Sequence, residues 1–254
     1  SDVCSSDLDR VAASRKGVIR TTVTRSENGL DLSVEGGKPL KKKALLDAAM
    51  LADTFDLARL TWNGEILVTR RDPHQRIGPA LVAPPPGGFL QATSEGEAAL
   101  LTAVREAIGS PSKLVDLFSG CGAFSIPFAI RTEVHAVEGD AALLAALTKG
   151  WKAVGGLARI TTEMRDLFRR PLLAEELNAY PAAIIDPPRA GAKAQMEQLA
   201  VSTIPVIASL SCDAGSFARD ARTLIDGGYT LSWAQPVDQF RWSSHVEIAA
   251  KFSK

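Results

Sequence analysis

The sequence predicts an α/β protein in which a small, mostly β unit precedes a doubly wound sheet with helices on both faces. Two observations support this prediction. From residue 94 onward, short apolar runs alternate with segments of helical periodicity, as in a parallel sheet whose strands are joined by crossover helices. Before residue 88, alternating polar and apolar residues flank two Asn-Gly pairs, which is typical of β-hairpins.

The N-terminal unit is expected to span residues 16–87. Its predicted elements, in chain order, are a hairpin over 17–35, a helix over 44–58, a hairpin over 58–71 and a Pro- and Gly-rich connector over 73–88. Residues 1–15 have neither an initiator Met nor the basic and apolar regions of a signal peptide. We expect them to be a leader rather than native structure.

The second domain is expected to span residues 88–254. It opens with a helix over 94–109, which begins at Ser94 with a glutamate three residues on, the pattern of a capping box. The strands that follow are predicted over 113–120, 134–140, 158–167, 182–189 and 204–211, with a final pair over 229–238 and 245–252. Helices are predicted between them over 125–131, 140–155, 192–201 and 216–228.

Composition and charge restrict the partners only partly. Lysine plus arginine equals aspartate plus glutamate, at 29 each, so the net charge says nothing about nucleic acid. A basic segment at 36–47 is either a solvated face or a phosphate contact. No apolar run approaches the roughly 18 residues of a membrane span, so no membrane partner is expected. Cys4, Cys121 and Cys212 stand far apart, which favours a reducing cytoplasmic location and no metal or disulfide framework.

Ligands of such a sheet bind beyond the carboxyl ends of its strands. After the first strand, Gly120 and Gly122 permit a tight turn, but Ser125 stands where a dinucleotide fingerprint has its third glycine. This favours an adenosyl ligand other than NAD. Glu138, after the second strand, is placed to accept from ribose hydroxyls, and Asp166, after the third, to accept from an adenine amino group. Each acid alone could instead be a helix cap or a surface charge.

Later strand ends carry reactive groups. Two prolines fix the loop between Asp186 and Arg189 after the fourth strand. Cys212 follows the fifth strand and is either a buried thiol or a nucleophile, whose thiolate a following helix N-terminus would stabilise. His245 and Glu247 alternate, so we expect them to share one face of the last strand.

The segments that carry these residues resemble a known family. In chain order, these segments are LVDLFSGCGAFSIP, IIDPPRAG, SLSCDAGSFARD and VDQFRWSSHVE. Together they resemble the RNA uracil-5-methyltransferases, the S-adenosylmethionine-dependent enzymes that make 5-methyluridine in 23S rRNA or tRNA. The resemblance covers most of residues 30–254 and implies a Rossmann-like class I methyltransferase sheet, preceded by part of a central RNA-contacting subdomain.

The resemblance also implies a mechanism and a set of site residues. Cys212 adds to C6 of the uracil ring, C5 then takes the methyl group, and Glu247 removes the C5 proton. The positions that the resemblance, together with the strand-end pattern, assigns to the S-adenosylmethionine site are Gln91, Phe118, Gly120, Glu138, Asp166 and Asp186. The target base must leave its stack to enter such a pocket.

The sequence departs from the family pattern close to the implied chemistry. Asp213 stands where the family has Asn, and a negative charge there is expected to raise the pKa of Cys212. The other departures are Ala123 for Asn, Ser209 for an aromatic residue, Ser216 for Thr and Arg241 for Pro.

The resemblance sets the expected partners and the alternatives. We expect RNA as substrate, rRNA rather than tRNA, and a monomer. The family's N-terminal RNA-binding barrel and iron–sulfur cysteines are not in this chain, so we expect weak RNA affinity and no cluster. The alternatives are a base-amino N-methyltransferase, disfavoured by Arg189 where an aromatic residue is usual; a cytosine-5 RNA methyltransferase, disfavoured by the lack of cysteine in the 186–191 loop; and an inactive RNA-binding remnant.

Overall fold

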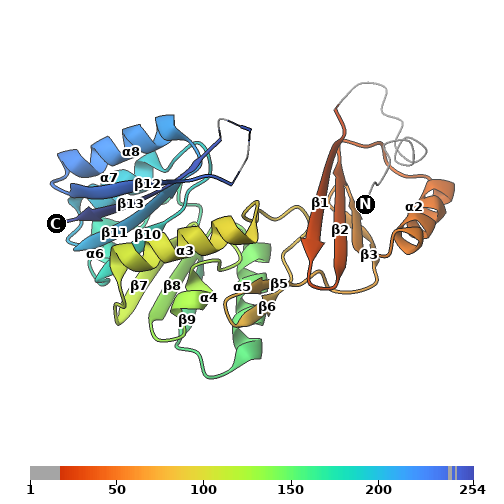
Figure 1. The fold of residues 1–254 in the computed structure, drawn as a ribbon, viewed down its shortest axis with the longest axis horizontal. Coiled ribbons are helices and arrows are strands. Elements are labelled where there is room, and N and C mark those ends of the chain that lie inside the picture. The colour runs from red at the N-terminus through yellow and green to blue at the C-terminus, as the bar shows by residue number, and fades with distance from the viewer. Residues whose placement is uncertain (1–17, 240–241, 244) are drawn as a thin grey trace. The chain divides into compact units, whose positions relative to one another are not determined.

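The chain folds into two compact units of unequal size. The computed structural model describes residues 18–239, 242–243 and 245–254. The first unit runs to Arg76 and includes Leu81–Gly88, and the second comprises Ile77–Ala80 and Phe89–Lys254. Figure 1 shows the first unit in red and orange and the second from yellow to blue. The predicted leader with Cys4, and the family departure at Arg241, lie outside the described residues.

The first unit is a four-stranded sheet in the order β1-β2-β3-β4 with one helix. Its elements are β1 (Arg20–Ser26), β2 (Gly29–Glu35), α2 (Lys42–Thr54), β3 (Leu57–Trp62) and β4 (Glu65–Thr69). Both Asn-Gly pairs turn hairpins as predicted, the first between β1 and β2 and the second between β3 and β4. The helix ends earlier than predicted, because Leu57 and Ala58 enter the sheet as buried strand residues.

The Pro- and Gly-rich connector contains secondary structure that the sequence pattern did not predict. Gln75–Ile77 (β5) and Ala80–Val82 (β6) form a two-stranded sheet. Gly78, between them, has φ +53°, a value that favours glycine. Strands of three residues are too short to show a period, so the prediction of an irregular connector was wrong here.

The second unit contains a seven-stranded sheet in the order β12-β13-β11-β10-β7-β8-β9. Its strands are β7 (Lys113–Leu117), β8 (Glu133–Glu138), β9 (Ile160–Met164), β10 (Ala182–Ile185), β11 (Val206–Ser211), β12 (Thr230–Val237) and β13 (Glu247–Ser253). Neighbouring strands from β11 through β10, β7 and β8 to β9 are parallel, whereas β13 runs antiparallel between β11 and β12. This confirms the predicted parallel sheet that ends in a hairpin.

Helices cover this sheet on both faces. They are α3 (Ser94–Ile108), α4 (Ser125–Phe128), α5 (Ala141–Val154), α6 (Ala174–Leu177), α7 (Lys193–Val201) and α8 (Ala214–Asp226). Successive residues of a strand point to opposite faces, and Ile184 and Ile185 are both 0% exposed, which requires cover on each side. Side chains of α7 and α8 pack with Ile185 in the main core, while α3 contacts β10, β11 and β13.

The cap of α3 lies one residue before the predicted one. The Thr93 side chain, not that of Ser94, accepts the backbone N–H of Gly96 at 3.0 Å. The Ser94 hydroxyl instead donates to Glu95. Both residues are good N-caps, and the extended backbone of Thr93 decides between them. Across the described residues, none of the helices combines the length and apolar character that crossing a bilayer requires.

Candidate active site

The predicted site residues gather at one edge of the seven-stranded sheet. The carboxyl ends of β7, β8, β9, β10 and β11 meet there, and so does the start of the antiparallel strand β13. The residues at this edge are Phe118, Gly120, Glu138, Asp166, Asp186, Cys212 and Glu247. Segments far apart in the chain therefore meet because parallel strands end together.

The loop after β7 turns sharply on glycines. Gly120 has φ +55° and Gly122 φ +95°, and Phe118 takes φ +62° although it is not glycine. A Cβ built on Gly122 would lie 2.9 Å from Cγ of Leu147, so α5 packs directly on the loop backbone. A non-glycine residue in the left-handed region is strained and is found disproportionately at functional sites.

Glu138, at the end of β8, organises the surrounding backbone. Its Oε2 accepts the N–H of Gly120 at 3.0 Å, and its Oε1 accepts those of Gly139 and Asp140 at 2.7 and 3.0 Å. The carboxylate thus ties the glycine loop to the next strand end. It is half-buried and has lone pairs left for a ligand, so the predicted ribose contact stays a prediction.

Asp166 shapes the loop after β9. Its Oδ1 accepts the N–H groups of Phe168 at 3.0 Å and Arg169 at 3.3 Å. The rings of Phe168 and Phe118 lie 5.3 Å apart at 57°, an arrangement that aromatic pairs prefer. Together these contacts place two aromatic side chains beside the predicted adenine position.

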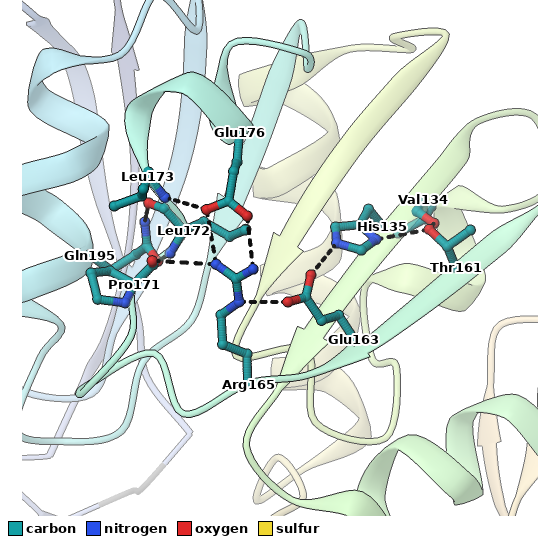
Figure 2. A network of polar contacts seen from close by, with 10 residues as sticks. All are labelled: Val134, His135, Thr161, Glu163, Arg165, Pro171, Leu172, Leu173, Glu176 and Gln195. Carbon is teal, nitrogen blue, oxygen red and sulfur yellow. Dashed lines mark hydrogen bonds and ion pairs between the residues drawn. The ribbon is translucent and has the colours of Figure 1, made fainter.

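A set of polar contacts around Arg165, the Arg165 network, holds the residue at the start of this loop (Figure 2). Arg165 donates to both carboxylate oxygens of Glu176, at 2.9 and 2.8 Å, and to Glu163. His135 bridges Glu163 and Thr161, at 3.1 and 2.9 Å. These contacts, between β8, β9 and α6, fix the residue that directly precedes Asp166.

A buried acid inside β7 escaped the sequence analysis. Asp116 is 0% exposed; its Oδ2 accepts the Ser125 hydroxyl at 2.6 Å, while its Oδ1 has no hydrogen-bond partner among the described residues. Burial raises the pKa of Asp116 to about 7. Asp116 lies inside the apolar run LVDLF, so it lacks the strand-end position by which the other acidic residues were recognised. The Ser119 hydroxyl is likewise buried and unpaired within the described residues.

Asp186, Cys212 and Glu247 form an electrostatically coupled group. Glu247 is 5% exposed, and burial raises its pKa. Burial, then Glu247 and Asp116, raise the pKa of Asp186 to about 7. Burial, then Glu247 and Asp186, raise the pKa of Cys212. In the free chain, burial and these two carboxylates therefore favour the protonated thiol. The stabilisation of a thiolate by the helix N-terminus stays a prediction.

Asp213 has a different role from the predicted one. It is the N-cap of α8, accepting the Ser216 N–H at 2.9 Å, and its Oδ2 lies 3.4 Å from Nε of Arg189. The Ser216 N–H, with Arg189, lowers the pKa of Asp213. Burial, followed by the carboxylates of Glu247 and Asp186 rather than that of Asp213, raises the pKa of Cys212. Asn would cap equally well, so this departure from the family pattern preserves the helix start.

His245 and Glu247 do not share a strand face. β13 begins at Glu247, and His245 lies before it, exposed, while Glu247 is buried. The expected alternation extended the strand two residues too far. Glu247 pairs with Val237 of β12 and so marks the very start of the ladder.

Residues of α8 hold the 186–191 loop, another feature that the sequence did not reveal. Asp220 is 4% exposed; its Oδ2 accepts the Ala192 N–H at 2.8 Å, and Arg219 donates to both Asp220 and the Ala190 carbonyl. Gly191 has φ +74°, and a Cβ there would lie 2.5 Å from Oδ2 of Asp220. The loop that presents Asp186 is therefore clamped to the helix that follows Cys212.

Asp220→Ala is expected to lower the free energy of unfolding by about 1–3 kcal/mol, because it leaves the buried Ala192 N–H unpaired. Chemical denaturation measures this difference. Asp226→Ala on the same helix is the matched control: Asp226 pairs with Arg222 on an exposed surface, and its loss should change stability by less than about 1 kcal/mol. Equal losses in both variants would show that Asp220 has no special part in the clamp.

Asp186→Asn is expected to stabilise the free chain at pH 8 by up to roughly 4 kcal/mol. The pKa of Asp186 rises from 3.8 to about 7 on folding. Between these values the folded chain binds more protons than the unfolded one, so stability falls as pH rises. The gain should therefore vanish below about pH 3, where the carboxyl is protonated in both states. Thermal unfolding at the two pH values measures it; an equal gain at both would contradict this explanation.

Gln91 lies before α3, not at a strand end. Its side-chain Oε1 accepts from Nε2 of Gln239 at 2.9 Å, which links it to the connection between β12 and β13. Among the described residues, there is no cluster of three or more histidine, cysteine or acidic side chains able to hold a metal ion.

The chain resembles proteins of known sequence over most of its length. No family model matches it. It is 46% identical, over 97% of its length, to an uncharacterized RNA methyltransferase of Mesorhizobium japonicum, and 41% identical, over 98%, to one of Brucella suis. It spans 60% of the length of each of these relatives. It is also 33% identical, over 64% of its length and 34% of the relative's, to the 23S rRNA (uracil(1939)-C(5))-methyltransferase RlmD of Chromohalobacter salexigens.

Solved structures share the fold. The tRNA (uracil-54, C5)-methyltransferase of Pyrococcus abyssi, in complex with S-adenosyl-L-homocysteine, superposes with a TM-score of 0.72 at 21% identity, covering 93% of this chain and 59% of that one. TYW2 of M. jannaschii, in complex with AdoMet, superposes with a TM-score of 0.52 at 18% identity, covering 74% of this chain and 90% of that one. The second unit therefore has the class I S-adenosylmethionine-dependent methyltransferase fold, in a chain similar over nearly all its length to bacterial RNA methyltransferases.

Proposed function

We propose that the chain is an S-adenosylmethionine-dependent RNA methyltransferase that methylates C5 of a uridine, in rRNA rather than tRNA, through a covalent cysteine adduct. One observation carries the proposal: Cys212 directly follows β11 and Glu247 begins β13, and the pairing of Ser211 with Ile248 brings the proposed nucleophile and base to the same sheet edge. The charge of Glu247 accordingly affects the pKa of Cys212. Covalent activation of a pyrimidine needs such a pair beside one ring.

The sheet edge suits a cationic adenosyl cofactor. The glycine loop allows close backbone approach, and Glu138 fixes its position. Asp116 and Asp186 offer carboxylates whose burial is unfavourable without a nearby cation. The residues proposed to hold S-adenosylmethionine are Gln91, Phe118, Gly120, Glu138, Asp166 and Asp186. The cofactor, when bound, supplies an electrophilic methyl group.

Cys212 performs the activating step. Its sulfur forms a bond to C6 of uracil, and the electron pair of the C5–C6 double bond moves to C5 and the C4 carbonyl, which makes C5 nucleophilic. The raised pKa of Cys212 means that the thiol is protonated in the free chain at neutral pH. Its proton must be taken up as the bond forms. Asp186, whose carboxylate affects the pKa of the thiol, is the proposed acceptor, which leaves Glu247 ionised for the release step.

Glu247 performs the release step. Once C5 carries the methyl group, the Glu247 carboxylate takes the C5 proton. The electrons of the C5–H bond re-form the C5–C6 double bond, and the Cys212 thiolate leaves. Burial raises the pKa of Glu247, which makes its carboxylate a stronger base than one in water.

The two units have separate proposed roles. Residues 88–254 carry the methyltransferase domain, and residues 16–87 contact RNA. The lysines at the start of α2 support this division, because Lys38, Lys41, Lys42 and Lys43 are exposed and close in sequence. Such a group can contact phosphates without reading a base sequence.

Nucleoside analysis tests the proposal. RNA from cells lacking the gene is incubated with the protein and methyl-labelled S-adenosylmethionine, then digested to nucleosides. The expected label is in 5-methyluridine and maps to rRNA. Label in 5-methylcytidine or in an N-methylated base would establish one of the alternative activities. No label in RNA of any class would favour an inactive remnant.

A further inference from the structure

A buried glutamine lies where the connection between β12 and β13 meets the start of α3. Gln239 is 8% exposed. A Cβ built on Gly96 would lie 2.4 Å from its side chain, so α3 has a glycine where Gln239 packs. Gln239 follows Val237 by two residues, and Val237 pairs with the proposed base Glu247. The glutamine therefore lies next to the catalytic edge but has no part in the steps described above.

The hydrogen bonds of Gln239 fix the orientation of its own amide. Its Oε1 accepts the backbone N–H of Ala92 at 3.1 Å and that of Thr93 at 3.4 Å. If the amide were rotated by half a turn, its –NH₂ group would face these two N–H donors. Donors cannot pair with donors, so the oxygen must point to the backbone and the –NH₂ group must point to Gln91.

The orientation of Gln239 in turn fixes that of Gln91. Because Nε2 of Gln239 donates, Gln91 must present its oxygen, and the bond is 2.9 Å long. The –NH₂ group of Gln91 then faces away from Gln239. Among the described residues, this group has no hydrogen-bond partner. Gln91 is half-buried rather than enclosed in the core.

We propose that Gln239 is a positioning residue that holds Gln91 with its –NH₂ group toward the ligand, so that Gln91 recognises an acceptor oxygen. This inference rests on the proposed function. Uracil offers a carbonyl oxygen at C4 where cytosine has an amino donor. The carboxylate of the cofactor offers the same acceptor chemistry. Either oxygen pairs with the group that Gln91 presents, and the amino group of cytosine does not.

Gln239→Glu tests this orientation with almost no change of shape. The new carboxylate still accepts from the N–H groups of Ala92 and Thr93, but it cannot donate to Gln91. Gln91 must turn its –NH₂ group inward and present its oxygen to the ligand. Gln198→Glu is the matched control, since Gln198 also accepts one backbone N–H, that of Ala174 at 3.1 Å, and is not part of the site.

Two measurements identify the acceptor. The first is the ratio of adduct-formation rates on RNAs carrying 5-fluorouridine or 5-fluorocytidine at the target position, and the second is the calorimetric Kd for S-adenosylmethionine. If Gln91 pairs with the uracil carbonyl, Gln239→Glu should lower the ratio of the 5-fluorouridine rate to the 5-fluorocytidine rate at least tenfold. A cofactor carboxylate partner predicts about a tenfold rise in Kd with an unchanged ratio. A general loss of structure would slow both RNAs alike, and the Gln198→Glu control should change neither quantity.

The proposal is overturned if Gln239→Glu changes both the ratio and the Kd by less than twofold. Should this variant fail to fold, Gln91→Glu gives the same test, because it keeps the acceptor toward Gln239 and removes the donor toward the ligand. If the wild-type chain forms no adduct with either RNA, the proposed uridine function fails, and the Kd measurement alone then decides the role of Gln239.

Discussion

Cys212→Ala is expected to abolish methyl transfer to RNA, with a loss on the order of 10⁴-fold or more. Without a sulfur to add to C6, C5 of uracil has no route to nucleophilic character, and the other described thiol near this edge, that of Cys121 in the glycine loop, is 4% exposed. Binding of S-adenosylmethionine should be retained, because no cofactor contact is assigned to Cys212. Single-turnover transfer of labelled methyl groups measures the first property and calorimetry measures the second.

The control for this variant is Cys4→Ala, which removes a thiol from the predicted leader. It should transfer methyl groups at the wild-type rate. Cys212 is only part-buried, whereas Cys121 is 4% exposed and its pKa rises to about 11 through burial. Alkylation by iodoacetamide should therefore modify Cys212 in preference to Cys121. If Cys212→Ala transferred methyl groups at a rate within tenfold of the wild-type rate, Cys212 would not be the nucleophile.

Glu247→Gln is expected to trap the enzyme on ordinary RNA. The variant can still form the sulfur–C6 bond and methylate C5, but it lacks the base that removes the C5 proton, a loss of about 10²–10⁴-fold in turnover. Methylated RNA should then stay covalently bound to protein and migrate with it in denaturing gels. The amide is close in shape to the carboxylate, which limits any packing effect at this buried position.

The same variant should change the titration of the thiol. The Glu247 carboxylate is the first of the two charges that raise the pKa of Cys212, so its removal should lower that pKa. The pH profile of iodoacetamide alkylation in the free protein should move to lower pH. An unchanged profile, together with release of methylated RNA at the wild-type rate, would mean that Glu247 is neither the base nor a neighbour of the thiol.

Much of the fold could be predicted because its signals are repeated and local. Each crossover unit of the second domain shows a short apolar run followed by helical periodicity, so an error of two residues in one element leaves the order intact. The two hairpins of the first unit turn at Asn-Gly pairs, in which Gly29 has φ +132° and Asn63 and Gly64 have φ +48° and +80°. The β5–β6 pair has no comparable signal, because three residues do not establish a period.

The candidate site could be predicted only where chemistry follows from strand ends. Glu138, Asp186 and Cys212 each come directly at or after an apolar run, and parallel topology brings them together. Asp116 lies inside a strand and Asp220 inside a helix, so neither shows this pattern. Their roles depend on the folded structure. Oδ1 of Asp116 is buried without a hydrogen-bond partner among the described residues, and Asp220 accepts the N–H of Ala192 from another element. The effect of burial on the Cys212 pKa likewise depends on three-dimensional neighbours, so the expected thiolate did not follow from sequence.

The covalent step is tested most directly by mass spectrometry of a trapped adduct. The wild-type chain is incubated with S-adenosylmethionine and RNA in which uridine is replaced by 5-fluorouridine. Fluorine at C5 cannot leave as a proton does, so the adduct should persist. The account predicts a peptide containing Cys212 that carries a 5-methyl-5-fluorouridine nucleotide, absent from Cys212→Ala. Methylation of ordinary RNA with no such adduct, or an adduct on another residue, would contradict it.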